Sequence, residues 1–287
     1  MTTPLPPVVG VLGGGTMGAG IAHAFLLAGC LVRVVERDAE QCAAASARVM
    51  HAVRASVERG TTAETVDALA ARLLVGATDD AFAECALVIE AVPEQFELKV
   101  ESLHRIERAA PHAVVASNTS AISIDDLAEA ATRPERFLGL HFFNPVPASK
   151  LVEVVRGSAT TDDTVGAAQD WVAGIGKTAI TVADAPGFAS SRLGVALGLE
   201  AIRMLEEGVA SADDIDSAMV LGYRHPVGPL RLTDIVGLDV RLGIAEYLQR
   251  RLGDRFAPPQ LLRDKVDAGE LGRKSGRGFF DWPEQPE

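Results

Sequence analysis

The stretch PVVGVLGGGTMGAGIAHAFLLAGCLVRVVERD, residues 7–38, decides the fold. It begins with a short apolar run, Val8–Leu12, which has the length and composition of a buried parallel strand. A glycine-rich turn follows, and then a segment with helical periodicity from residue 17 to 28. A second apolar run, Leu31–Val35, ends at Glu36. This order of strand, glycine turn, helix and strand predicts the first unit of a parallel α/β sheet.

The glycines of this turn have the spacing G-x-G-x-x-G, and the acidic Glu36 stands at the end of the next strand. Together these features form the complete dinucleotide-binding fingerprint. The glycines permit a tight turn, close approach of a pyrophosphate and close packing of the helix on the strand. The pyrophosphate then meets the unpaired amides of the helix N-terminus. We therefore expect a Rossmann-type domain whose cofactor contacts are Gly13, Gly15, Thr16, Met17, Gly18 and Glu36.

The cofactor is expected to be NAD. The carboxylate of Glu36 would accept hydrogen bonds from the adenosine ribose hydroxyls and would repel a 2′-phosphate. Arg33 and Arg37 stand close by and could soften that repulsion, which leaves NADP as the alternative.

The composition excludes several function classes. The 287 residues are enough for two domains, and the net charge of −12 argues against general nucleic-acid binding. The three cysteines lack metal-like or redox-like spacing, so we expect no metal and a cytoplasmic location. No charged side chain occurs in residues 1–32, yet the glycines and prolines there, with no preceding basic residue, argue against a membrane span or signal peptide.

The alternation of strands and helices continues to a seam near Pro186-Gly187. Apolar runs at 86–92 and 113–118 predict further buried strands, and the helical patterns at 39–59 and 63–73 lie before them. Helical periodicity alone follows the seam, at 190–208 and 234–251. We predict a Rossmann domain over residues 1–184 and an all-α substrate and dimerisation domain over 185–287. The helices need a partner for their apolar faces, so we expect a homodimer.

The long helical pattern before the third strand carries three arginines, Arg48, Arg54 and Arg59. Arg48 and Arg59 fall near one helical face. Two interpretations remain open for these arginines, an ordinary solvated face or an anion-binding patch for a phosphorylated substrate.

Ionisable residues inside apolar runs mark a candidate site in FLGLHFFNPVPASKLVEVV, residues 137–155. His141 ends the first run and Glu153 lies inside the second. Hairpin counting does not decide whether both point to one face, because the proline-containing loop can shift the register. Ser117-Asn118 also ends a strand, at the sheet edge where ligands bind in open α/β folds. Ser123 and Asp126 are explained as the N-cap and first-turn acid of the next helix.

A series of motifs in order supports a resemblance. GGGTMGAGIA, VIEAVPE, ASNTS, HFFNPVPASKLVEVV, DAPGF, HPVGPL, DIVGLDV and LGRKSGRGFFDW follow one another from about residue 8 to 282. The sequence resembles the 3-hydroxyacyl-CoA dehydrogenases of fatty-acid metabolism, in their short stand-alone form close to 3-hydroxybutyryl-CoA dehydrogenases. The resemblance implies reversible oxidation of (S)-3-hydroxyacyl-CoA to 3-ketoacyl-CoA by NAD.

The resemblance also implies roles for single residues. His141 would be the catalytic base, Glu153 its partner, and Ser117 a hydrogen-bond donor to the substrate oxygen beside the nicotinamide. Asn144 would lie near the cofactor and the substrate. The remaining implied contacts with the nicotinamide side of the cofactor are Ala91, Val92, Glu94, Lys99 and Asn118, and the implied acyl-CoA contacts include Arg48 and Arg54.

One position departs from the family pattern. The motif PGFxxNR, whose Asn helps to hold the substrate carbonyl, here reads PGFASSR, so Ser191 stands at that position with a shorter reach. Two other functions stay open. One is an NAD-dependent sugar-acid dehydrogenase of the gulonate type on the same scaffold, and the other is a weakly active NAD-binding protein.

Overall fold

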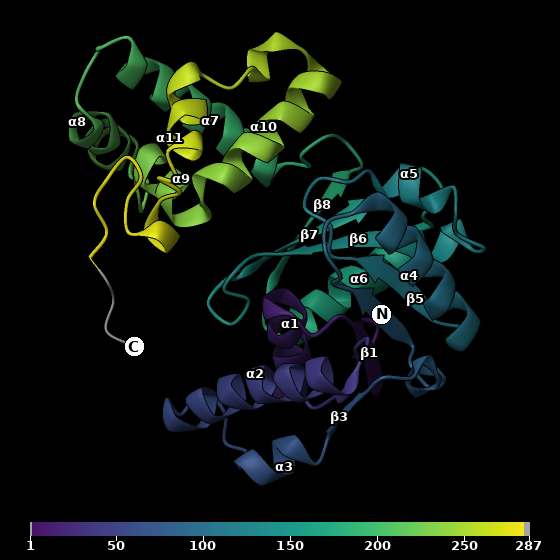
Figure 1. Ribbon diagram of the computed structural model, residues 1–287. Coiled ribbons are helices and arrows are strands. Elements are labelled where there is room, and N and C mark those ends of the chain that lie inside the picture. Colours follow the sequence, from purple (N-terminus) through teal and green to yellow (C-terminus); the bar gives the residue numbers. More distant parts are fainter. Residues whose placement is uncertain (1, 284–287) are drawn as a thin grey trace. The chain divides into compact units, whose positions relative to one another are not determined.

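The computed structural model of the chain describes residues 2–283. The chain divides into two compact units, Met1–Ala185 and Pro186–Glu287. Residues 1 and 284–287, which belong to the two predicted domains, lie outside the described residues. Each unit is built from the elements labelled in Figure 1.

The first unit is a single eight-stranded sheet with helices around it. Its strand order is β3-β2-β1-β4-β5-β6-β7-β8, and every neighbouring pair is parallel except β6 and β7. The strands are β1 (Val8–Leu12), β2 (Leu31–Val35), β3 (Leu73–Gly76), β4 (Leu87–Glu90), β5 (Val114–Ser117), β6 (Phe137–Phe142), β7 (Leu151–Arg156) and β8 (Thr178–Ala183). The sheet confirms the predicted doubly wound Rossmann-type fold, with the switch point between β1 and β4.

The centre of the sheet is buried because helices cover it. Every residue of β1 and β4 is buried, which explains their continuous apolar runs. The α-helices of this unit are α1 (Thr16–Leu27), α2 (Ala39–Glu58), α3 (Val66–Ala70), α4 (Phe96–Ala109), α5 (Ile124–Ala128) and α6 (Asp162–Gly174). The side chain of Ser123 accepts a hydrogen bond from the amide of Asp126, so the predicted N-cap of α5 is confirmed.

The helix expected at residues 63–73 is correct only in its middle. Only Val66–Ala70 is helical, and Leu73–Gly76 forms the edge strand β3. This segment pairs in parallel with β2, from Val32↔Leu73 to Val35↔Gly76. Pairing with an existing strand therefore outweighs the helical periodicity, which such a short apolar run cannot distinguish from a strand.

The second unit is helical, as predicted. Its α-helices are α7 (Ser190–Glu206), α8 (Ala212–Ser217), α9 (Pro229–Val236), α10 (Leu238–Leu252) and α11 (Gln260–Asp267), with a π-helical turn at Ala218–Gly222. The side chain of Ser211 accepts a hydrogen bond from the amide of Asp214 and caps the start of α8. Among residues 2–283, no helix combines the length and apolarity needed to cross a bilayer.

The single helix predicted over residues 234–251 is broken into α9 and α10 at Gly237. Gly237 has φ +105°, a left-handed value that no continuous α-helix accepts. The break leaves Asp234 fully buried at the end of α9. Its carboxylate accepts hydrogen bonds from the amides of Phe279 and Phe280, both at 2.9 Å, and from Nε1 of Trp282 at 2.8 Å. A buried carboxylate thus holds the aromatic tail against α9.

Candidate active site

The predicted pair of His141 and Glu153 lies on the one antiparallel pair of strands in the sheet. The two residues stand directly opposite in the β6–β7 register, so their side chains share a face. Nδ1 of His141 lies 2.7 Å from Oε2 of Glu153. His141 is 4% exposed and Glu153 is fully buried. The ladder, rather than the loop between the strands, therefore settles the question that hairpin counting left open.

The carboxylate fixes how the imidazole can act. An ionised carboxylate only accepts hydrogen bonds, so Nδ1 of His141 carries the proton that it shares with Glu153. Nε2 is then the nitrogen with a lone pair that can take a proton. The ring of Phe143 lies 4.4 Å from the imidazole ring, centroid to centroid, and adds an apolar contact. This arrangement has the geometry that a general base with an orienting partner requires.

The glycine turn and its neighbours enclose a cavity of about 460 Å³. Most of the predicted cofactor contacts line it, namely Gly13, Gly15, Thr16, Met17, Glu36, Ala91 and Val92. The first turn of α1 has neither an acidic residue nor a side-chain cap, and a Cβ added to Gly15 would meet no atom within 4 Å. The donors and the open space at this helix N-terminus fit a dinucleotide pyrophosphate.

The carboxylate of Glu36 is held by backbone amides beside the glycine turn. Its Oε1 accepts a hydrogen bond from the amide of Gly14 at 2.7 Å, and its Oε2 accepts from the amide of Arg37 at 3.2 Å. The carboxylate therefore lies beside the turn, on the wall of the same cavity.

A buried ionic network joins β4, α4 and β5. Lys99 is 2% exposed, and its Nζ lies 2.8 Å from Oε1 of Glu90 and 3.2 Å from Oε2 of Glu94. Glu90 also accepts from the amide of Val92 at 2.7 Å. Sequence reasoning missed Glu90, although a carboxylate that ends the apolar run LVIE was a usable signal.

Glu94 closes this network at the surface. Its Oε1 accepts from the hydroxyl of Thr119 at 2.6 Å and from the amide of Ser120 at 2.9 Å. Burial alone would raise the pKa of Glu94, but the charge of Lys99 and these hydrogen bonds outweigh it and lower the pKa. Glu94 therefore stays ionised and holds the loop that follows β5.

The placement of Ser117 argues against direct contact with substrate. Ser117 is 1% exposed, and its hydroxyl donates to Oε2 of Glu90 at 2.6 Å. Its oxygen is part of the buried network instead. Ser120, the second serine of the same motif, is partly exposed on the loop beside Glu94.

The two predicted asparagines have different surroundings. Oδ1 of Asn118 accepts from the amide of Phe142 at 2.9 Å, so Asn118 ties the end of β5 to β6 next to His141. Asn144 is exposed in the β6–β7 loop and lines a second cavity of about 620 Å³, together with Thr16, Gly20 and Arg48.

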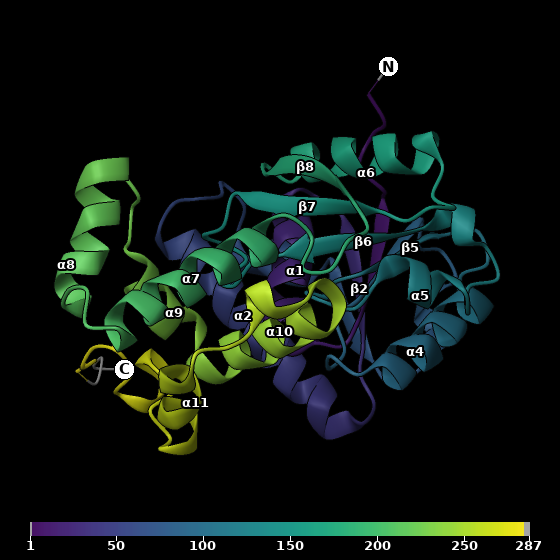
Figure 2. The ribbon, with the colours of Figure 1, turned by 90° about the horizontal axis from the view of Figure 1, so that it is seen from above.

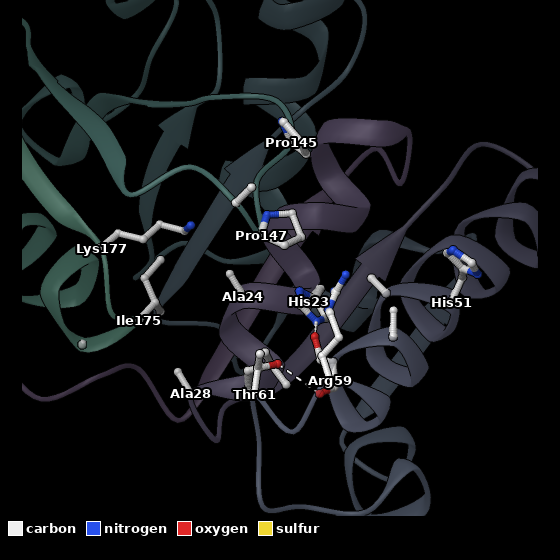
Figure 3. A pocket seen from close by; sticks show the side chains of 16 residues that line it. His23, Ala24, Ala28, His51, Arg59, Thr61, Pro145, Pro147, Ile175 and Lys177 are labelled. Atoms are coloured by element: carbon white, nitrogen blue, oxygen red, sulfur yellow. Dashed lines mark hydrogen bonds between the residues drawn. The ribbon is translucent and has the colours of Figure 1, made fainter. Parts of the chain in front are cut away.

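A third cavity, of about 690 Å³, adjoins the second one. Both are lined by His51, Ala52, Pro145 and Pro147, so a continuous groove runs along α2 beneath the proline loop. Figure 3 shows Arg59 and Lys177 at this third cavity. Arg48 donates to the carbonyl of Gly14 at 3.3 Å. Arg54 lines neither cavity, since it lies on another side of α2.

Two basic residues, Lys177 and His23, lie behind the proline-containing loop between β6 and β7. Lys177 is half-buried and His23 is buried. Nζ of Lys177 donates to the carbonyls of Val146 and Ser149, at 2.6 and 2.5 Å, and so holds the loop from the start of β8. His23 is 2% exposed, and its Nε2 lies 2.9 Å from Oγ of Ser56. Burial, followed by the charges of Arg59 and Lys177, lowers the pKa of His23 below 6.5.

Ser191 belongs to the second unit. It is half-buried in the first turn of α7 (Ser190–Glu206).

Comparisons with known proteins agree over the whole length of the chain. Residues 8–185 match the family model described as "3-hydroxyacyl-CoA dehydrogenase, NAD binding domain", and residues 187–282 match "3-hydroxyacyl-CoA dehydrogenase, C-terminal domain". The chain is 42% identical over 278 residues to the probable 3-hydroxybutyryl-CoA dehydrogenase of Bacillus subtilis, covering 96% of this chain and 97% of the relative.

Two further relatives extend this likeness. The 3-hydroxybutyryl-CoA dehydrogenase of Bradyrhizobium diazoefficiens is 43% identical over 277 residues, covering 96% of this chain and 94% of the relative. The crystal structure of (S)-3-hydroxybutyryl-CoA dehydrogenase from Ralstonia eutropha superimposes with a TM-score of 0.92 at 38% identity. That match covers 97% of this chain and all of the other.

Proposed function

The chain belongs to the 3-hydroxyacyl-CoA dehydrogenase family, and from this we infer that it oxidises short (S)-3-hydroxyacyl-CoA thioesters, such as 3-hydroxybutyryl-CoA, to 3-ketoacyl-CoA with NAD. The chain is an NAD-dependent oxidoreductase. The observation that carries the assignment to a site is the buried contact of 2.7 Å between His141 and Glu153.

His141 performs the proton transfer in this proposal. Its Nε2 takes the proton of the 3-hydroxyl group as C3 loses hydride, and the carboxylate of Glu153 stabilises the imidazolium that forms. In the reverse direction the imidazolium returns the proton to the ketone oxygen. NAD supplies the hydride acceptor when it is bound.

The cofactor is held by the cavity around the glycine turn. The amides at the start of α1 bind the pyrophosphate, and Glu36 binds the adenosine ribose, which favours NAD over NADP. Glu94 and Lys99 lie along the nicotinamide side of the cofactor. Asn118 and Asn144 lie near the loop that follows His141. Ser120, whose side chain is partly exposed, is a better candidate than the buried Ser117 for the hydroxyl that contacts substrate and nicotinamide.

The groove along α2 is proposed to hold the CoA part of the substrate. Arg48 and Arg59 stand at its two cavities and supply positive charge for phosphate groups. Arg54 contributes only to the general positive potential of the helix. Ser191 donates a hydrogen bond to the substrate carbonyl where the family often has Asn.

Two broader properties remain predictions. The second unit is proposed to mediate a homodimer, since large apolar side chains such as Leu221 and Tyr223 are exposed on it. The cytoplasmic location rests on the three unpaired cysteines, Cys30, Cys42 and Cys85.

An absorbance assay tests the proposal. Purified protein is mixed with acetoacetyl-CoA and NADH, and NADH oxidation is followed, with NADPH in a parallel reaction. We expect turnover with NADH and much slower turnover with NADPH. Absence of turnover with both cofactors would refute the proposed reaction.

A further inference from the structure

A cluster of three ionised side chains at the end of β4 has a net negative charge. Glu90 is 3% exposed, and its Oε1 lies 2.8 Å from Nζ of Lys99, which is 2% exposed. The same Nζ lies 3.2 Å from Oε2 of Glu94. These three residues form the Glu90 cluster. It holds two carboxylates and one ammonium group, and in residues 2–283 no other lysine or arginine pairs with either carboxylate.

Both carboxylates of the Glu90 cluster are ionised. Besides Lys99, the carboxylate of Glu90 has two donors, the amide of Val92 at 2.7 Å and the hydroxyl of Ser117 at 2.6 Å. Since an ionised carboxylate only accepts hydrogen bonds, these donors stabilise the ionised form. For Glu94, the charge of Lys99 and several hydrogen bonds outweigh the effect of burial and lower the pKa. The cluster therefore keeps its negative charge at neutral pH.

The cofactor cavity adjoins the Glu90 cluster. Ala91 and Val92, which directly follow Glu90, line the cavity of about 460 Å³, whereas Glu90 itself does not. Both arginines that line this cavity are paired with aspartates, Arg37 with Asp38 at 3.1 Å and Arg105 with Asp79 at 2.7 Å. The charge of the cluster is therefore not offset from the wall. Because Glu90 lies behind that wall, it can act on a ligand only through its charge.

The strand order indicates which half of the cofactor lies nearest to the cluster. β1 pairs with β2 on one side and with β4 on the other. The proposed site of the pyrophosphate is the start of α1, and that of the adenosine ribose is Glu36, next to the end of β2. The nicotinamide half then extends across β1 toward the ends of β4 and β5, in the direction of His141 on β6. The helix α4, which carries Lys99, packs against β5, as Figure 2 shows.

The two redox forms of the cofactor differ in charge at this half, since the oxidised nicotinamide ring is cationic and the ring of NADH is neutral. We propose that the Glu90 cluster favours binding of oxidised NAD over NADH. Glu90 is then a specificity-determining residue that acts without touching the cofactor. Burial strengthens such an effect, because the interior screens charges less than water does. This inference rests on the proposed function, in which the cavity around the glycine turn holds NAD.

Binding measurements on the full chain test the charge of Glu90. The Kd of NADH is measured by fluorescence titration and the Kd of NAD by calorimetry, and the affinity ratio is the first divided by the second. Glu90→Gln removes the charge and keeps the size of the side chain. It should lower the affinity ratio about 10-fold, through a higher Kd for NAD. Glu90→Asp keeps the charge, and its ratio should stay within about 2-fold of wild type even where both affinities fall.

The affinity ratio separates the effect of charge from a structural effect. A distorted site weakens both forms of the cofactor alike, so a folded Glu90→Gln variant with an unchanged ratio would overturn the inference. Glu64→Gln is the matched control and should keep the wild-type ratio. Glu64 lies 2.6 Å from Arg72 in the same unit, and it does not line the cofactor cavity. If Glu90→Gln fails to fold, Glu94→Gln removes the same charge from the cluster and must lower the ratio.

Turnover of acetoacetyl-CoA distinguishes failure of this inference from failure of the proposed function. A wild-type enzyme that turns over, together with a Glu90→Gln variant that has an unchanged affinity ratio, would refute only the role of Glu90. A wild-type chain that binds neither NAD nor NADH would refute both.

Discussion

At the residue scale, the imidazole of His141 can be removed without touching the cofactor cavity. His141→Ala should lower kcat by about 10²- to 10⁴-fold, because proton transfer from the hydroxyl loses its acceptor. NADH binding, measured by fluorescence titration, should stay within about 2-fold of wild type. Near-normal turnover of this variant would contradict the role of His141.

Glu153 acts through the histidine, so its replacement tests positioning. Glu153→Gln keeps the size of the side chain but replaces an ionised acceptor with an amide, and the buried imidazolium loses its counter-charge. We expect kcat to fall about 10- to 100-fold while KM changes little. A variant that changes KM alone would place Glu153 in substrate binding instead.

His23 gives a residue-scale prediction about pH. Its pKa is lowered in the folded protein, so below 6.5 the unfolded chain takes up a proton that the folded chain does not. The free energy of unfolding therefore falls as pH drops from 6.5 toward the lower folded-state pKa, and this contribution is absent above that range. Urea unfolding of His23→Gln should show a shallower loss of stability over the same range. His51→Gln, at an exposed histidine of the same cavity, should follow the wild type.

Sequence reasoning identified His141, Glu153 and Glu36, because each ionisable group stands out in or beside an apolar run. It did not show that the hydroxyl of Ser117 turns inward to Glu90. Both serines of ASNTS follow or end a buried strand, and only the partner carboxylate of Glu90 shows which hydroxyl turns inward.

At the element scale, the glycines of the turn between β1 and α1 have different roles: Gly18 permits close packing, and Gly15 leaves space for the cofactor. A Cβ on Gly18 would overlap the carbonyl oxygen of Gly13, whereas one on Gly15 would meet no protein atom within 4 Å. Gly18→Ala should therefore lower stability by about 1 to 3 kcal/mol in urea unfolding. Gly15→Ala should fold normally and weaken NADH binding, since its methyl group occupies the space of the pyrophosphate. Equal effects of the two variants on stability would contradict this division.

The break between α9 and α10 supports a second prediction at this scale. Asp234→Asn leaves one carboxamide oxygen to serve three donors from the aromatic tail, and its NH₂ group faces an N–H group. We expect a loss of about 2 to 3 kcal/mol in the free energy of unfolding. Trp282→Phe, which removes a single donor, should cost about 1 kcal/mol. If both variants unfold at the wild-type urea concentration, Asp234 does not hold the tail.

The element boundaries that sequence reasoning missed depend on distant partners. The helical pattern predicted over residues 63–73 ends at Ala70, and Leu73 instead begins the edge strand β3, which pairs with the open edge of β2. The periodicity of residues 234–251 predicts one continuous helix, but the helix breaks at Gly237. Close to the break, the carboxylate of Asp234 in α9 binds the aromatic tail. Both features come from contacts between segments far apart in the chain.

At the scale of the whole molecule, the exposed apolar side chains predict self-association. Sedimentation should give a mass about twice the 30.2 kDa of the chain. Leu221→Lys should shift the equilibrium toward the monomer, because Leu221 is 80% exposed on the second unit. Leu74→Lys, at a 50% exposed leucine of the first unit, is the control and should leave the mass unchanged. A wild-type chain that sediments as a monomer at micromolar concentration would contradict the dimer.

Because β6 pairs directly with β7, the loop between these strands can be exchanged while His141 and Glu153 keep their places. The pair of His141 and Glu153 is fixed by a backbone ladder, whereas the loop between the strands, residues 143–150, lines the groove beside α2. Loop sequences from other dehydrogenases can therefore be grafted between Phe142 and Leu151 to change which thioesters fit, without rebuilding the proton relay. A graft must present carbonyl oxygens to Lys177, the lysine that now anchors the loop, and must keep Asn144, which is proposed to lie near the cofactor.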